Sequence, residues 1–166
     1  MNKVYRKLAF TNIKNNGSLY LPYIISGMVT VAMFYIMMFL NNSKGLEKIY
    51  GSSYLTSIMA LGVGTIAVFS YIFIFYTNSF IIKRRKKEIG VYNILGMEKR
   101  HIAKLMGIET VTVALIAIIG GIVTGILFSK LSILLLYKIL AVKETVKFEI
   151  NFSTIINTLI VFGILY

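Results

Sequence analysis

Residues 83–104 read KRRKKEIGVYNILGMEKRHIAK, and this basic stretch separates two long apolar runs. The run before it holds no charged residue from Ile49 to Ile82, and the run after it extends to about residue 128. Each run is long enough for a helix that crosses a hydrocarbon core of about 30 Å. We therefore expect membrane-spanning helices at about 56–82 and 105–128, joined by a loop at 83–104.

The apolar pattern continues toward both ends of the chain. Residues 19–40, LYLPYIISGMVTVAMFYIMMFL, are uncharged and long enough to span a membrane, whereas the run at 150–166 is marginal in length. Hydrophobic residues make up 57% of the 166 residues and charged residues only 14%, which excludes a soluble or disordered chain. The sequence predicts an all-α, polytopic helical membrane protein with three full transmembrane helices plus the start of a fourth, truncated at 150–166.

The distribution of Lys and Arg predicts the orientation, because cytoplasmic segments carry an excess of both. The 83–104 loop holds eight of them and the N-terminal tail four, so both are expected in the cytoplasm. The connections at 41–55 and 129–149 are expected outside. Residues 1–18 favour an amphipathic helix on the lipid surface over a disordered basic tail. Alternating apolar and polar residues at 146–152 predict a short extended segment.

The chain lacks the residues that several kinds of active site require. The chain has no Cys, no Asp and a single His, His101, so neither a catalytic triad nor a metal site is expected. It also lacks the G-x-x-x-x-G-K-[ST] sequence of a phosphate-binding loop, which argues against ATP binding by that route. We therefore expect no enzyme activity and no cofactor in this chain.

The basic run at the start of the loop resembles a patch that binds nucleic acid. Beside a membrane helix it is better interpreted as a positive-inside anchor, and no nucleic acid partner is expected. The anchor residues are Lys83, Arg84, Arg85, Lys86 and Lys87.

A short apolar stretch lies inside the basic loop. Five of the seven residues from Ile89 to Leu95 are apolar, too few to cross a membrane. The composition favours a short helix that ends at Gly96, because glycine accepts the left-handed conformation that follows many helices. Such a helix would either dock into a partner's groove or rest on lipid with its cations on anionic headgroups. The residues alone leave both alternatives open.

The third predicted span carries two further features. Small residues recur at every fourth position of one helix ridge, which favours close packing of another helix over an interface that moves during transport. Glu109 is a membrane-embedded charge, for which an ion pair or a role at the helix start is favoured over proton transfer. Its candidate partners are Lys99, Lys104 and the basic run. The small residues are Ala117, Gly121, Gly125 and Ser129.

The loop and the span after it resemble a known family. KRRKKEIGVYNILGMEKRHI, followed by IETVTVALIAIIGGIVTGILFSKL, has the order of features of FtsX-like permeases of ABC transporters. That order is a basic run, E-I-G, an apolar stretch, L-G, further basic residues, and an acid that opens a glycine-rich helix. The N-terminal KLAFTNIKNNGSLYLPYI and the closely spaced first two spans are similar to the bacitracin-export (BceB-like) branch.

The resemblance implies that residues 1–166 form the first FtsX-like permease module, whose work is mechanical coupling. A separate cytoplasmic ABC ATPase would bind ATP, and the remaining half of the permease would supply a large external domain. Members of the branch export, detoxify or sense peptide antibiotics, often beside a sensor histidine kinase, in the plasma membrane of Gram-positive bacteria. The residues implied in ATPase coupling are Glu88, Ile89, Gly90, Val91, Tyr92, Leu95 and Gly96.

The residues leave two other interpretations open. A small standalone membrane protein, either a pore-former or a regulator, would stop naturally at Tyr166 and self-assemble. A truncated, non-functional reading frame would be degraded without binding an ATPase. The length of the native product would distinguish both from one end of a longer permease.

Overall fold

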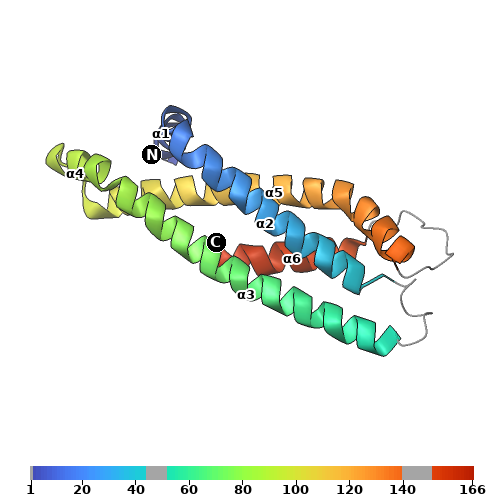
Figure 1. The fold of residues 1–166 in the computed structure, drawn as a ribbon. Coiled ribbons are helices and arrows are strands. Elements are labelled where there is room, and N and C mark those ends of the chain that lie inside the picture. Colours follow the sequence, from blue (N-terminus) through green and yellow to red (C-terminus); the bar gives the residue numbers. More distant parts are fainter. Residues whose placement is uncertain (1, 44–51, 140–150) are drawn as a thin grey trace.

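The computed structural model describes residues 2–43, 52–139 and 151–166, and these residues form six helices (Figure 1). The helices are α1 (Asn2–Asn15), α2 (Gly17–Asn41), α3 (Ser52–Arg84), α4 (Lys86–Ile94), α5 (Lys99–Ile139) and α6 (Phe152–Leu165). By length and composition α2, α3 and α5 are able to cross a membrane, and α6 is a shorter apolar helix. The predicted helical membrane fold is therefore confirmed.

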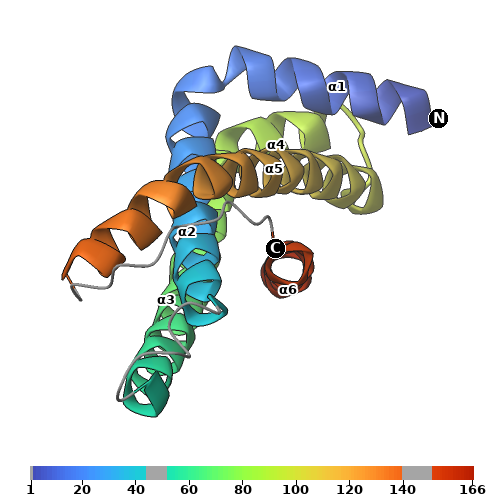
Figure 2. The same ribbon diagram turned by 90° about the vertical axis from the view of Figure 1, so that its right-hand side faces the viewer.

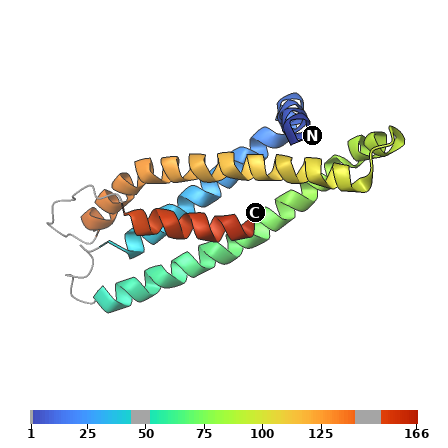
Figure 3. The same ribbon diagram turned by 180° about the vertical axis from the view of Figure 1, so that it is seen from behind.

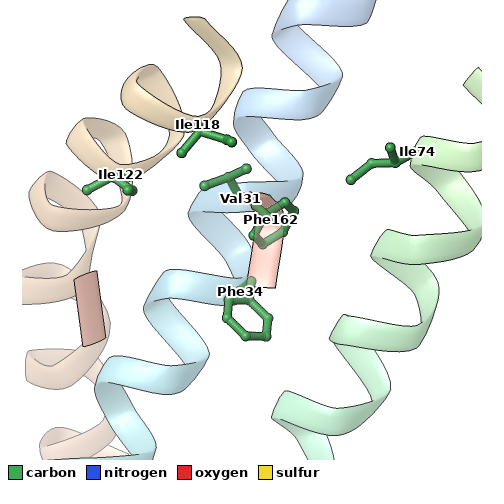
Figure 4. Close-up of a cluster of buried hydrophobic side chains, with 6 residues drawn as sticks. All are labelled: Val31, Phe34, Ile74, Ile118, Ile122 and Phe162. Atoms are coloured by element: carbon green, nitrogen blue, oxygen red, sulfur yellow. The ribbon is translucent and has the colours of Figure 1, made fainter. Parts of the chain in front are cut away.

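Helix α2 is the centre of the bundle. It makes its most extensive contact with α5 and the next with α3, and α6 packs against both α2 and α5 (Figures 1 and 3). In one core cluster the rings of Phe34 and Phe162 meet edge to face, with centroids 5.5 Å apart. This cluster comprises Val31 and Phe34 of α2, Ile74 of α3, Ile118 and Ile122 of α5, and Phe162 of α6 (Figure 4).

The contact between α2 and α5 depends on glycine. A Cβ added to Gly121 would lie 2.5 Å from Cβ of Val31 and 2.8 Å from the main-chain oxygen of Met28. At Gly125 it would lie 2.8 Å from the ring of Tyr35. The backbone of α5 therefore approaches α2 more closely than any other residue would permit.

Helix α5 is longer than the predicted span. The predicted span ended at about residue 128, before a mixed segment expected outside the membrane, but α5 continues without a break to Ile139. Ile133 and Tyr137, four residues apart on one helix face, are buried with Leu40 and Met59. This packing extends the helix despite Lys130 and Lys138. Of the extended segment predicted at 146–152, residues 146–150 lie outside the described residues. Its last residue, Phe152, begins α6, so the prediction is wrong at that position.

Helix α1 crosses one end of the bundle, near α4 and the first turns of α5 (Figure 2). Its bounds confirm a helix within residues 1–18. Helix α1 contacts α5, and Ala9 is buried. Phe10, Arg6 and Lys7 stay exposed.

Candidate functional site

Helix α4 is a short segment with a well-defined end. It stops at Ile94, and Gly96 adopts a φ of 83°, in the left-handed region. The amide of Gly96 donates to the carbonyl of Asn93 at 3.1 Å, and the amide of Met97 donates to the carbonyl of Tyr92 at 3.0 Å. These two bonds form a Schellman motif, which usually requires glycine at this position. The predicted short helix that ends at Gly96 is therefore present.

The side chains of α4 divide into two groups. None of its nine residues, all of which the structure describes, is fully buried. Glu88, Ile89 and Tyr92 are half-buried on the side toward the bundle. Val91 is 54% exposed, Ile94 88% and Leu95 73%. These last three residues recur at helical spacing and form one apolar ridge, here called the α4 ridge.

Gly90, another residue implied in coupling, lies within α4 and is exposed. A Cβ added to Gly90 or to Gly96 would meet nothing within 4 Å. Both glycines therefore leave open space beside the α4 ridge, and neither makes a close contact with the bundle.

Arg85 differs from the other four residues of the basic run. Lys83, Arg84, Lys86 and Lys87 are exposed, whereas Arg85 is only 2% exposed. Its Nη1 forms an ion pair with Oε2 of Glu109 and donates to the Tyr20 hydroxyl at 2.7 Å. Its Nε donates to Oε2 of Glu88 at 2.9 Å. The assignment of all five residues as one anchor overlooked that Arg85 points into the protein, where these acceptors satisfy its charge.

Glu109 is the main acceptor of this cluster and is itself 2% exposed. Besides Arg85, it accepts hydrogen bonds from Nδ2 of Asn12 at 2.9 Å and from the Tyr20 hydroxyl at 3.0 Å. Glu109 does not lie at a helix start, because α5 begins at Lys99. Further hydrogen bonds offset the cost of burying a carboxylate with a guanidinium, and Asn12 and Tyr20 donate such bonds to Glu109.

The cluster extends to α4 and to the junction of α1 and α2. Nδ2 of Asn16, the residue between α1 and α2, donates to Oε1 of Glu88 at 3.1 Å. Nδ2 of Asn12 also lies 3.4 Å from the Tyr92 hydroxyl. We call this group the polar junction; it comprises Asn12, Asn16, Tyr20, Arg85, Glu88, Tyr92 and Glu109.

A cavity of about 180 Å³ lies beside the polar junction. Tyr20, Arg85 and Glu109 line one part of it, together with Asn78, which accepts a hydrogen bond from the Tyr23 hydroxyl at 2.6 Å. Apolar side chains, among them Ile81, Met106 and Val113, make up much of the remaining lining. Among residues 2–43, 52–139 and 151–166, no group of three or more His, Cys, Asp or Glu side chains is arranged to hold a metal ion.

The small residues predicted for helix packing all lie on the buried side of α5. Gly121 and Gly125 face α2, and Ala117 lies near Gly27 of α2, where a Cβ on Gly27 would be 3.1 Å from that of Ala117. Ser129 is 2% exposed and donates to the carbonyl of Ile126. The structure therefore brings these residues to one interface, away from the polar junction.

Three residues of the polar junction were missed by sequence analysis. Asn12, Asn16 and Tyr20 follow one another at intervals of four, which places them on one ridge of a helix. A polar ridge that enters an apolar helix was the signal available. This signal could not be interpreted from the sequence, because the residues that these three side chains contact lie at least 65 residues away.

Comparison with known families adds the decisive observation. A family profile described as FtsX-like permease C-terminal matches residues 60–166. The chain belongs to the FtsX-like permease family. The matched residues of this permease include Arg85, Glu88 and Glu109 of the polar junction, and the whole of α4, α5 and α6.

Individual relatives of this FtsX-like permease are named as ABC transporter permeases. The uncharacterized ABC transporter permease YvcS of Bacillus subtilis is 31% identical over 163 residues, 97% of this chain and 25% of the relative. The bacitracin export permease protein BceB of Bacillus subtilis is 30% identical over 164 residues, 96% of this chain and 25% of the relative. The protein of the same name from Halalkalibacterium halodurans is 24% identical over 159 residues, 96% of this chain and 24% of the relative. The chain thus spans about a quarter of the length of these relatives.

Family membership and the apolar helices together identify a multi-pass membrane protein of the ABC transporter permease type. Four of the seven residues of the polar junction lie within the part of the chain that the family profile matches. The residues of the polar junction connect four helices at one end of the bundle, close to α4.

Proposed function

We propose that this chain is the first permease module of an ABC transporter and that α4 docks a separate cytoplasmic ATPase. The observation that supports this most directly is the α4 ridge of Val91, Ile94 and Leu95, which is exposed at the end of the bundle where basic residues are concentrated. An apolar ridge left in water marks a surface that another protein covers. A short amphipathic helix is the element that fits a partner's groove.

The proposed division of labour follows from what the sequence contains. The chain has no phosphate-binding loop sequence, so ATP would bind to the partner subunit and no cofactor would bind here. The work of this module would be mechanical: closure of the ATPase would push on α4, and α4 would pass that movement to α3 and α5. On this proposal the chain is not an enzyme.

We propose peptide antibiotics of the bacitracin type as the substrate class, to be exported, detoxified or sensed. The support is that two relatives are named bacitracin export permease protein. Because those relatives are about four times longer, the remaining half of the permease is a proposed partner, as is a sensor histidine kinase. Membrane lipids would surround the exposed apolar sides of α3 and α5.

The proposed location is the plasma membrane of a Gram-positive bacterium, with the N-terminus in the cytoplasm. The support for the host is that the relatives come from Bacillus subtilis and Halalkalibacterium halodurans. The support for the orientation is the concentration of Lys and Arg in residues 1–18 and 83–104, which lie at the same end of the bundle.

Leu95→Glu tests the proposed docking of the ATPase. A charge at this exposed position would disrupt an apolar interface without touching the bundle, so we expect ATP hydrolysis that co-purifies with the tagged protein to fall about tenfold or more. Resistance to bacitracin in the source cells should fall with it. The amount of protein in the membrane should not change.

Ile139→Glu is the matched control, because Ile139 is 80% exposed at the opposite end of α5. It should leave the co-purifying ATP hydrolysis unchanged. If Leu95→Glu also leaves hydrolysis and resistance at the level of the unmodified protein, α4 rests on lipid instead and the docking proposal is wrong.

A further inference from the structure

We propose that Arg85 is a positioning residue that fixes the orientation of α4 relative to the transmembrane helices. This inference rests on the proposed function, because it assigns to α4 the role of docking helix. Arg85 is the residue between α3, which ends at Arg84, and α4, which begins at Lys86. Its amide donates to the carbonyl of Ile81 at 3.1 Å, and its carbonyl accepts from the amide of Ile89 at 3.0 Å. The two helices are thus joined at this residue without a loop.

The side chain of Arg85 contacts α4 and two further helices, α2 and α5, from this position. Nη1 binds Glu109 of α5 and Tyr20 of α2, while Nε binds Glu88 of α4. One guanidinium therefore lies between the docking helix and the two helices that form the main contact of the bundle. A change in the angle between α3 and α4 would separate Glu88 from Arg85 or pull Arg85 away from Glu109.

The polar contacts matter here because apolar packing holds α4 only weakly. No residue of α4, a helix described in full, is buried, and the α4 ridge is exposed. The hydrogen bonds of Glu88 with Asn16 and of Tyr92 with Asn12 are further polar contacts that connect α4 to the end of the bundle. An element with few buried contacts takes its orientation from such bonds and opens easily when they are lost.

The geometry requires arginine and not merely a positive charge. The planar guanidinium presents Nε and Nη1 in a fixed fork, and here the two nitrogens bind different carboxylates. Lysine has one nitrogen on a flexible stem and cannot keep both directions fixed. Arg85→Lys should therefore retain the charge beside Glu109 but release α4.

A second variant removes the complication of an unpaired buried charge. Removing Glu109 or Arg85 alone would leave its partner uncompensated, and the protein would then misfold for an unrelated reason. The double variant Arg85→Met with Glu109→Leu replaces the pair by apolar side chains of similar length, which a buried site tolerates. It leaves Glu88 without its partner on α3–α4.

The test measures the position of α4 directly, in lipid nanodiscs and without any ATPase. Because the chain has no Cys, spin labels attach only at introduced cysteines. One pair, Ile94→Cys with Leu115→Cys, reports α4 against α5, and a second pair, Met33→Cys with Leu127→Cys, reports α2 against α5. All four positions are exposed in the structure.

We expect the Ile94–Leu115 distance distribution to become roughly twofold broader in Arg85→Lys and in the double variant, as for an element released from its tertiary contacts. The Met33–Leu127 distribution should stay unchanged, and so should both distributions in Lys86→Gln, which alters an exposed neighbour. An unchanged Ile94–Leu115 distribution in both variants would overturn the inference. Equal broadening of both label pairs would also overturn it, because Arg85 would then hold the whole bundle.

This outcome is separable from that of the proposed function. A protein whose α4 is released by Arg85→Lys, but whose unmodified form binds no ATPase, supports the positioning role and contradicts docking. If the α4 ridge binds the ATPase but Arg85→Lys leaves the orientation of α4 unchanged, docking is supported and the positioning role is contradicted.

Discussion

At the scale of single residues, Gly121 sets the distance between the two most closely packed helices. A Cβ at this position would approach the main-chain oxygen of Met28, an atom that cannot turn aside as a side chain does. By contrast, Gly64 on α3 has nothing within 4 Å of the corresponding position. The two glycines therefore have different reasons to be there, although both belong to apolar membrane helices.

We expect Gly121→Ala to reduce the free energy of unfolding by about 1–3 kcal/mol, because α2 and α5 must separate to admit the methyl group. Gly64→Ala should be neutral or stabilise the protein by up to about 1 kcal/mol, since alanine favours helix and meets nothing there. Unfolding of both variants in mixed micelles, followed by circular dichroism, measures the difference. Equal stabilities would argue against close packing at Gly121.

The residue scale is also where sequence analysis was weakest. Glu109 was identified as a buried charge, and the basic run was among its candidate partners, but nothing distinguished Arg85 from Lys86 or Arg84. Whether a side chain is buried depends on the direction in which it points at the α3–α4 junction. Five consecutive cations contain no pattern that predicts which of them points inward. Asn12, near the end of α1, and Tyr20, near the start of α2, were overlooked because polar residues near helix ends are common on exposed surfaces.

At the scale of elements, α4 was the easiest feature to anticipate. Its length is limited by basic residues on both sides, and its end is marked by a glycine. Gly96 and Gly90 nevertheless differ: Gly96 has a φ of 83°, whereas Gly90 lies inside the helix. Their substitution should therefore have opposite effects on α4.

We expect Gly96→Ala to destabilise the end of α4 by roughly 1 kcal/mol, since alanine is strained in the left-handed region. Gly90→Ala should stabilise α4 by a similar amount, about 1 kcal/mol, because glycine weakens a helix interior. Amide hydrogen exchange of residues 86–95 in nanodiscs measures both: exchange should be faster in the first variant and slower in the second. The same direction of change in both would contradict the Schellman motif described for Gly96.

Element ends were predicted less well where packing opposed composition. The span was predicted to end near residue 128, but α5 continues because Ile133 and Tyr137 pack against α2 and α3. Hydropathy indicates whether a segment favours water or lipid, but it does not indicate which other helices the segment packs against. The last 11 residues of the 41-residue helix were therefore not included in the predicted span.

At the scale of the whole molecule, the two ends of the bundle differ in character. One end carries α1, α4 and the polar junction; the other carries the ends of α2 and α5 and the starts of α3 and α6 (Figure 1). The proposed orientation places the first end in the cytoplasm. A membrane-impermeant thiol reagent distinguishes the two ends, because the chain has no cysteine of its own.

We expect intact cells to be labelled at Asn42→Cys and not at Lys87→Cys, because only the former would face outward; both positions are exposed. Permeabilised cells should be labelled at both. Val31→Cys, buried in the core, should stay unlabelled in either case and serves as the control. Labelling of Lys87→Cys in intact cells would invert the proposed orientation.

The architecture was predictable because a bilayer leaves few alternatives. Every backbone polar group in hydrocarbon must be satisfied within its own segment, so the lengths of the apolar runs are enough to predict spanning helices. The order of packing was not predictable. Each span is apolar all round, and the central position of α2 follows from local shape, such as the glycines of α5 that admit it.

Because α5 is long, a movement at the polar junction would be transmitted to the opposite end of the bundle. At a rise of about 1.5 Å per residue, the 41 residues of α5 extend for roughly 60 Å, twice the thickness of a hydrocarbon core. Glu109 lies near one end, and Ile139 is about 45 Å further along the same continuous helix. If α5 turns as a stiff lever about Glu109, a tilt of about 10° moves its far end by roughly 8 Å. A small rotation on the side of α4 would thus become a movement wider than a side chain on the opposite face of the membrane.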